Sequence, residues 1–193
     1  MTKIIGRGRV IIITAPSGAG KTTIVRHLLA KFDFLDFSVS ATNRTSRSHE
    51  IDGIDYYFYN TDDFQNLIST DKLIEWEEVY EDQYYGTLKR EIKRIWRKNR
   101  AIVFDVDVKG ATTLKERFGD DALAIFIKPP SIEELLVRLK NRKTETPKSL
   151  AKRIKRAKKE LTYENNFDKI IVNDVLETAI EDAEKMVIAF LGN

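Results

Sequence analysis

The feature that most restricts the fold is a short glycine-rich loop between a strand and a helix. Residues 9–14 form a β-branched apolar run typical of a buried strand, and residues 22–31 have a helical pattern. Glycines let backbone N–H groups converge on an anion, and a helix N-terminus adds partial positive charge. This order predicts a phosphate-binding loop (P-loop) made by Ala15, Pro16, Ser17, Gly18, Ala19, Gly20, Lys21 and Thr22.

Two side chains of this loop carry the expected chemistry. Lys21 can reach the β- and γ-phosphates of a nucleotide, and the Thr22 hydroxyl can bind Mg²⁺. Ala15 stands where the strict pattern has its first glycine, and its methyl group is tolerated at negative φ. The alternative, a glycine-rich turn that binds nothing, is disfavoured by the Gly-Lys-Thr sequence after a buried strand. The loop alone does not separate a GTPase, an ATPase and a small-molecule kinase.

The rest of the chain alternates apolar runs with helical patterns. Such an order is typical of an α/β protein whose parallel sheet is covered by helices on both faces. Gly119 is expected to end one helix and Ser131 to cap the next. The predicted buried strands are residues 9–14, 101–106, 122–127 and 169–172, and the predicted helices are residues 22–31, 87–98, 109–117, 132–142, 147–163 and 178–190.

Residues 56–79 have a different pattern, in which the strands mix apolar and polar side chains. Strands at residues 56–59 and 73–79 flank a helix at residues 61–70, for which Thr61 is the expected N-cap. A short strand at residues 37–40 and a polar stretch precede this region. We interpret it as a small subdomain inserted into the parallel α/β core.

Composition excludes several classes of protein. The 193 residues include no cysteine, which excludes disulfides and thiolate metal sites, and only two histidines, which excludes a multi-histidine metal site. The net charge of +3 argues weakly at best for a nucleic-acid partner. The longest aliphatic run, residues 10–13, is far shorter than the roughly 18 residues of a membrane span. We therefore expect one domain in a cytoplasmic protein without nucleic-acid or membrane partners; the oligomeric state stays open.

A polar loop after the short strand carries two arginines. Arg44 and Arg47 lie three positions apart, and each guanidinium can bind a phosphate through two parallel hydrogen bonds. The alternative is a pair of solvated surface arginines. Tyrosines close in the sequence favour a phosphate site, because their hydroxyl groups can add further hydrogen bonds.

From this loop onward, an ordered set of motifs resembles the guanylate kinases, P-loop nucleoside monophosphate kinases that move a phosphoryl group from ATP to GMP. The resemblance runs from the P-loop to residues 172–174 and covers nearly the whole chain. The matching segments are residues 38–58, 75–76 (EW), 84–87 (YYGT), 105–111 (DVDVKGA), 129–135 (PPSIEEL), 138–145 (RLKNRKTE) and 152–153 (KR). Departures from the family pattern are Asn43, Ser46, His49, Lys109, Lys143 and one extra residue within 80–83.

This resemblance implies a P-loop kinase fold in a single domain of residues 1–193. The core would comprise residues 1–40, 88–128 and 164–193, with a mixed α/β GMP-binding subdomain at about 41–87 and a helical lid at about 129–163. The implied enzyme is a phosphotransferase of purine nucleotide metabolism. It uses ATP and Mg²⁺ to convert GMP, and dGMP, to the diphosphate.

The resemblance also implies roles for individual residues. The phosphate of GMP would contact Arg44, Arg47, Tyr56 and Tyr85, and the guanine ring would contact Ser40, Glu75, Thr87 and Asp107. The catalytic cations would be Lys21, Arg44, Arg138, Arg142 and Arg153. Asp105 and Thr22 would hold Mg²⁺, partly through water, and Asn173 would contact the donor base. Of seven basic residues from Lys148 to Lys159, only Arg153 is assigned a role; most of the others are interpreted as a solvated helix face.

The chemistry of the side chains supports the guanine assignment. An ionised Glu75 is only an acceptor, and guanine offers two adjacent donors, N1–H and N2–H₂, which adenine lacks on that edge. The alternative is an exposed strand carboxylate. Asp105 and Asp107 end a buried strand at the edge where ligands of parallel sheets bind, and alternation points both to one face. Helix capping is the alternative for Asp107.

Two other classes of function stay open. The first is a noncatalytic guanylate-kinase-like module that binds protein partners; such modules tend to lose the P-loop lysine, and Lys21 is present. The second is a P-loop kinase for another nucleoside monophosphate. Glu75 and Thr87 disfavour this alternative because they favour guanine. A nucleic-acid binder is a more distant alternative because the net charge is modest.

Overall fold

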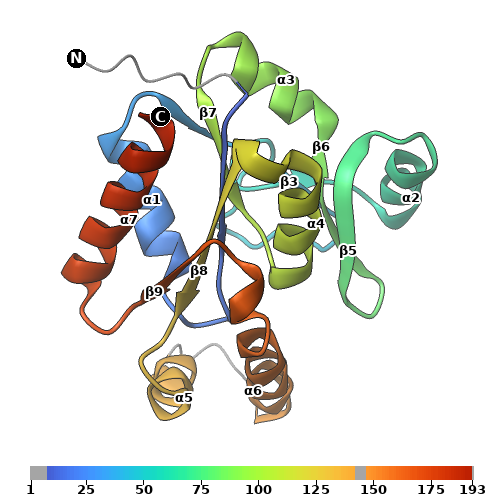
Figure 1. Cartoon of the computed structure of the whole chain (residues 1–193). Coiled ribbons are helices and arrows are strands. Elements are labelled where there is room, and N and C mark those ends of the chain that lie inside the picture. Colours follow the sequence, from blue (N-terminus) through green and yellow to red (C-terminus); the bar gives the residue numbers. More distant parts are fainter. Residues whose placement is uncertain (1–7, 142–146, 193) are drawn as a thin grey trace.

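The computed structural model describes residues 8–141 and 147–192. Its core is a five-stranded parallel sheet in the order β2-β7-β1-β8-β9. Figure 1 labels three of its strands, β7, β8 and β9. All four predicted strands are present; three of them are buried, whereas the strand at residues 169–172 lies at the sheet edge with only Ile171 buried. The strand predicted for residues 37–40 is wrong, because a fifth core strand ends at Phe37 and a strand of the second sheet begins at Ser40. The strands are β1 (Val10–Thr14), β2 (Leu35–Phe37), β7 (Ala101–Asp105), β8 (Ala122–Lys128) and β9 (Lys169–Val172).

Helices cover both faces of this sheet, as the alternation of apolar and helical segments predicts. Ile11 and Ile13 of β1 face α1 (Lys21–Lys31) and α7 (Leu176–Leu191). Val10 and Ile12 of the same strand face α3 (Lys89–Arg97) and α4 (Val108–Phe118). Because successive side chains of a strand point to opposite faces, one short apolar strand serves two core layers. The predicted C-cap of α4, Gly119, is confirmed.

A second sheet of four strands stands beside the core sheet, on the right in Figure 1. Its order is β4-β3-β6-β5, and α2 packs on it through the fully buried Phe64. The small hydrophobic core of this unit also contains Ala41, Leu73 and Leu88. Its elements are β3 (Ser40–Thr42), β4 (Tyr57–Phe58), α2 (Thr61–Ser69), β5 (Leu73–Tyr80) and β6 (Gln83–Leu88).

Two local predictions in this unit are wrong. The N-cap of α2 is Asn60, not Thr61, because the Asn60 side chain accepts a hydrogen bond from the backbone N–H of Asp63 at 2.7 Å. The helix predicted for residues 87–98 begins only at Lys89. Thr87 belongs to β6, where it pairs with Glu75 of β5 and Ser40 of β3.

The segment with one residue more than the family pattern, residues 80–83, lies in the hairpin between β5 and β6, just before Tyr84 and Tyr85. The pairing register shifts between Glu78 and Tyr80, as in a β-bulge, and Asp82 in the turn has a φ of 57°. From Glu75 to Glu78 the ladder is regular, and a second shift lies between Leu73 and Glu75. The pairing of Glu75 with Thr87 therefore lies at one end of the regular part of the ladder.

Two helices lie below the core sheet in Figure 1, α5 (Ile132–Asn141) and α6 (Pro147–Leu161). They share a small apolar cluster that contains Leu135, Leu139 and Ala157. Ser131 caps α5 as predicted, because its hydroxyl oxygen accepts a hydrogen bond from the N–H of Glu134 at 3.1 Å. Among the described residues, no helix combines the length and hydrophobicity that crossing a membrane requires.

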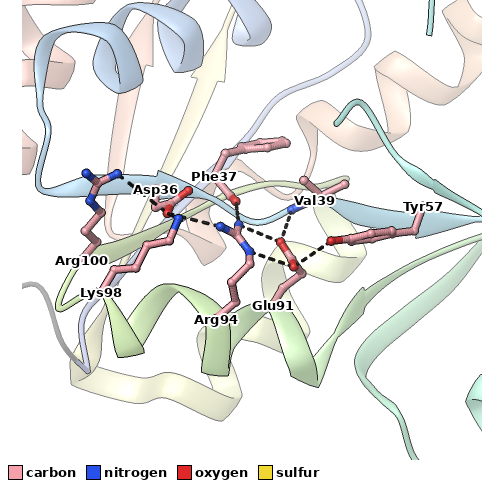
Figure 2. Close-up of polar contacts among 8 residues, drawn as sticks. All are labelled: Asp36, Phe37, Val39, Tyr57, Glu91, Arg94, Lys98 and Arg100. Carbon is pink, nitrogen blue, oxygen red and sulfur yellow. Dashed lines mark hydrogen bonds and ion pairs between the residues drawn. The ribbon is translucent and has the colours of Figure 1, made fainter. Parts of the chain in front are cut away.

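Buried charge fixes the connection between the two sheets, as Figure 2 shows. Glu91 of α3 is 1% exposed, and one carboxylate oxygen accepts from the N–H of Val39, which links β2 to β3. The other oxygen accepts from the Tyr57 hydroxyl of β4 at 3.0 Å. Arg94 donates to both oxygens and to the carbonyl of Phe37 on β2. Glu91 thus holds parts of both sheets against one helix.

We expect Glu91→Gln to lower the free energy of unfolding by about 2–3 kcal/mol, because an amide N–H₂ would replace an acceptor that faces only donors. Arg94 is partly exposed, so water would relieve part of the loss. Urea unfolding measures the change, with Glu116→Gln as a control on the exposed face of α4. Equal stability of the two variants would contradict the assigned role of Glu91.

Candidate active site

A cavity of about 390 Å³ lies where the carboxyl ends of β1 and β7 meet the second sheet and α6. Parallel α/β sheets bind ligands at this edge. The predicted loop residues 15–22 all line the cavity. So do six other predicted site residues, namely Ser40, Tyr56, Glu75, Tyr85, Asp105 and Asp107.

The loop has the backbone shape that its sequence predicts. Gly20 has a φ of 93°, a conformation that side chains of L-residues rarely adopt, and it is the N-cap of α1. A Cβ atom at Gly20 would lie 2.2 Å from the Nδ2 atom of Asn173. Asn173 is buried, and that nitrogen donates a hydrogen bond to the carbonyl of Ala19 at 2.7 Å. In this structure, Asn173 therefore supports the loop.

Lys21 and Asp105 form an ion pair inside the cavity. Burial lowers the pKa of the Lys21 ammonium group to about 8, and the negative charges of Asp107 and Glu160 oppose this shift. A buried cation next to a row of glycine N–H groups is suited to a polyanionic ligand. Such a ligand would release Lys21 from Asp105 by offering stronger negative charge.

Oxygen atoms at the same end of the cavity fit a hard divalent cation. Thr22 is the second residue of α1, Asp105 ends β7, and both line the cavity. Mg²⁺ prefers one or two protein oxygens and completes its shell with water and phosphate oxygens. Within residues 8–141 and 147–192 there is no group of three or more His, Cys, Asp or Glu side chains placed to hold a metal. The donor set thus suits a cation that arrives with a phosphate ligand.

Glu75 on β5 is a buried hydrogen-bond acceptor in the cavity. Its side chain accepts from the Thr87 hydroxyl at 2.5 Å. Burial raises the pKa of Glu75 to about 7, the Thr87 hydrogen bond opposes this shift, and the charges of Asp107 and Glu77 add to it. A Cβ atom at Gly110 would lie 2.9 Å from the second Glu75 oxygen, so only glycine leaves room for this carboxylate.

Asp107 has two partners as well as a place in the cavity wall. One carboxylate oxygen accepts from the N–H of Gly110 at 2.9 Å and caps α4, as the capping alternative proposed. The other oxygen accepts from Arg156 of α6 at 2.9 Å. Capping and a position in the cavity are therefore compatible, because each uses a different part of the carboxylate.

Arg44 lies against the two tyrosines of the cavity. Its guanidinium donates to the Tyr85 hydroxyl at 3.2 Å and lies 4.9 Å from the centre of the Tyr56 ring. Two further hydrogen bonds, of 2.5 and 2.7 Å, run to the Glu50 carboxylate and lower the pKa of Glu50 to about 2. The side chain of Arg47 is 61% exposed, and its backbone N–H donates to Glu50.

Two predicted lid arginines, Arg138 and Arg153, lie outside this arrangement. Arg138 donates to the Asn173 carbonyl at 2.9 Å and to Glu134, next to the P-loop support but not in the cavity wall. Arg153 is half-exposed on α6 and is not among the described residues that line the cavity. Arg142 lies outside the described residues.

Four residues of the site were missed by the sequence interpretation. Glu50 and Gly110 lie within motifs of the resemblance, but their contacts to Arg44 and Glu75 depend on the folded chain. Arg156 and Glu160 sit in the basic segment that was interpreted mostly as a solvated face, yet both line the cavity. Nothing in the local sequence separates Arg156 from its basic neighbours.

Comparisons with known proteins agree on one family. The family model described as guanylate kinase matches residues 7–189. The guanylate kinase of Bacteroides fragilis is 46% identical over 187 residues, covering 97% of this chain and 92% of the relative. That of Porphyromonas gingivalis is 46% identical over 185 residues, covering 95% and 98%.

The fold agrees with the same family. A crystal structure of guanylate kinase from Anaplasma phagocytophilum superimposes with a TM-score of 0.78 at 27% identity, covering 98% of this chain and 88% of that one. The similarity includes the parallel sheet flanked by helices, so the predicted fold class is confirmed. With a family match over most of its length and close relatives of equal extent, the chain belongs to the guanylate kinase family.

Proposed function

We propose that this chain transfers the γ-phosphoryl group of ATP to GMP, and to dGMP, giving ADP and the nucleoside diphosphate, with Mg²⁺ as the cofactor. The observation that carries the proposal is the buried carboxylate of Glu75, which accepts from Thr87 and lies in the wall of the same cavity as the P-loop. An acceptor in this position would select guanine beside a loop that would bind phosphate. The names of the relatives support the same reaction.

The acceptor half of the cavity has the groups that GMP requires. Ionised Glu75 would accept from guanine N1–H and N2–H₂, with Thr87, Ser40 and Asp107 around the ring. Tyr85 and Tyr56 would meet the phosphate together with Arg44, whose guanidinium the Glu50 carboxylate orients. Arg47, exposed in this structure, would complete the phosphate site. A site built on hydrogen bonds rejects an analogue that lacks them by roughly 10⁴-fold.

The donor half holds the nucleotide triphosphate. The P-loop N–H groups and Lys21 would bind the β- and γ-phosphates, and Asn173 would hold the loop, as its contact with Ala19 supports, besides reaching the donor base. Thr22 and Asp105 would hold Mg²⁺, partly through water, and the ion would neutralise phosphate charge. Arg138, Arg142 and Arg153 would approach the phosphates when α5 and α6 move toward the cavity.

The chemical step needs no general base. The attacking atom is an oxygen of the GMP phosphate, which is largely ionised at neutral pH. The chain's own contribution is to bring this oxygen in line with the γ-phosphorus and to neutralise the transferring group with Lys21 and the arginines. Approach of the lid helices would also exclude water and thereby suppress hydrolysis of ATP.

The test is ADP release from Mg-ATP by the purified protein with GMP, dGMP, AMP, CMP, UMP or dTMP, one at a time, and without acceptor. We expect turnover with GMP and dGMP only. ADP release that ignores the acceptor would identify an ATPase instead. Preference for another nucleotide would contradict the assigned base contacts, and GMP binding without any turnover would favour a noncatalytic module.

A further inference from the structure

Arg156 lies on α6, one of the two lid helices. Its side chain contacts both the core, at Asp107, and the second sheet, at Val79 and Tyr80. Its three guanidinium nitrogens are each used. Nη2 donates to Asp107 at 2.9 Å, Nη1 donates to the backbone carbonyl of Val79 at the end of β5 at 3.2 Å, and Nε donates to Glu160 at 2.6 Å. The guanidinium carbon lies 5.3 Å from the centre of the Tyr80 ring. The side chain is 23% exposed and lines the cavity.

We propose that Arg156 is a positioning residue for the acceptor nucleotide, which acts by fixing the Asp107 carboxylate and the end of β5 against the lid helix. This inference rests on the proposed phosphorylation of GMP. No motif of the family resemblance selects Arg156 from the basic residues of α6. Its contacts in the folded chain are what distinguish it.

The contact with Asp107 explains why one side chain can matter for the acceptor. Each Asp107 oxygen has one recorded donor, the N–H of Gly110 and the guanidinium of Arg156. Loss of Arg156 would leave one carboxylate oxygen without its charged partner and free the group to rotate about its terminal torsion. Asp107 lies in the cavity wall with Glu75, and the charge of Asp107 contributes to the raised pKa of Glu75.

The shape of arginine matters as much as its charge. The planar fork spans acceptors on two elements, a carboxylate after β7 and a main-chain carbonyl at the end of β5. Glu160, one turn later on α6, holds the plane through Nε, and the Tyr80 ring covers it. A lysine could pair with Asp107 as a point charge but could not hold both acceptors in fixed directions.

These contacts predict a kinetic signature that separates the acceptor from the donor. Arg156 touches Asp107 and the strand that carries Glu75, whereas its link to the P-loop is indirect, through Glu160, whose carboxylate interacts with the backbone N–H of Ser17. Arg156→Met keeps an unbranched apolar stem for packing and removes the three donors. We expect it to raise KM for GMP at least tenfold and to change KM for ATP less than twofold. Arg156→Lys should give an intermediate KM for GMP.

The experiment measures both KM values for the wild type, both Arg156 variants and Lys155→Met, an exposed neighbour on the same helix, as the control. Thermal melts establish whether each variant folds. If Arg156→Met does not fold, the comparison of Arg156→Lys with the wild type tests the proposal. Equal KM for GMP in all folded proteins would overturn the proposal. So would an equal rise of KM for ATP, which would indicate general damage to the lid.

A double-mutant cycle with Asp107→Asn tests the stated route. If Arg156 acts through Asp107, the double variant should have a KM for GMP close to that of the worse single variant. Multiplication of the two effects would overturn the route through Asp107. Turnover of GMP by the wild type in the same assay checks the proposed function separately. If the wild type binds GMP without turnover, calorimetric GMP affinity replaces KM with the same expected ratios; without GMP binding, the inference is wrong.

Discussion

Replacing Lys21 by alanine is expected to lower kcat by ~10³-fold or more while the protein stays folded. Lys21 is the P-loop cation in the cavity, and phosphoryl transfer depends mainly on neutralising the charge of the transferring group. Burial already disfavours its charged form, as its lowered pKa indicates, so Lys21 is retained at a cost to stability. Removal should therefore affect turnover far more than folding.

Single-turnover and steady-state rates with saturating Mg-ATP and GMP measure this effect. The matched control is Lys31→Ala at the other end of α1, where the lysine pairs with Glu184 on the surface. Lys21→Arg should not restore the rate, because a wider planar fork does not fit where a compact ammonium group sits. Turnover of Lys21→Ala close to that of the control would contradict the assignment of the loop as the donor site.

The core of the fold was predictable because its signals are local. The strand Lys169–Val172 was predicted with its observed bounds, and the runs that form β1, β7 and β8 are apolar on both faces of the sheet. An apolar run of this kind indicates a buried strand from its own sequence, whichever strands pair with it. Strand β6 is not predicted, because its last residues continue into the helical pattern of α3 and its pairing partners lie on β3 and β5.

The site divides in the same way. The P-loop is one continuous segment, so its sequence predicts a glycine-rich turn between β1 and α1 and the position of Lys21. Arg156 contacts a carboxylate 49 residues away and a carbonyl 77 residues away, and its own segment contains many basic side chains. Only the tertiary arrangement brings that arginine to these two acceptors. Long-range polar contacts of this kind leave no periodic signal in a single sequence.

Replacing Glu75 by glutamine is expected to lower kcat/KM for GMP by ~10²-fold or more and to leave KM for ATP unchanged. Glutamine can accept from one guanine donor, but its N–H₂ group would face the other donor in a buried place. The conservative shape keeps the packing against Gly110. Glu81→Gln, exposed in the turn that follows β5, is the control. Unchanged GMP kinetics would remove Glu75 from guanine recognition.

The pKa of Glu75, about 7, adds a pH dependence whose sign can be worked out. GMP requires the ionised form, so wild-type KM for GMP should fall about tenfold from pH 6 to pH 8. The phosphate of GMP also titrates in this range, and the KM of Glu75→Gln measures that separate contribution. The tenfold fall is expected in addition to it. The facing groups are Thr87, Asp107 and Glu77, and both carboxylates disfavour ionisation.

The folding stability should fall as the pH rises, whereas GMP binding should become tighter. A carboxyl group whose folded pKa lies above its ordinary 4.5 costs nothing below pH 4.5 and destabilises the fold increasingly as the pH rises to 7. The full cost above pH 7 is about 3 kcal/mol. Glu75→Gln should therefore be the more stable protein at pH 8, by up to this amount, and gain nothing at pH 4. Equal stabilities at pH 8 would mean that the ionised carboxylate is not costly where it stands. A variant that is more stable but less active would show that Glu75 destabilises the fold and is nevertheless needed for GMP binding.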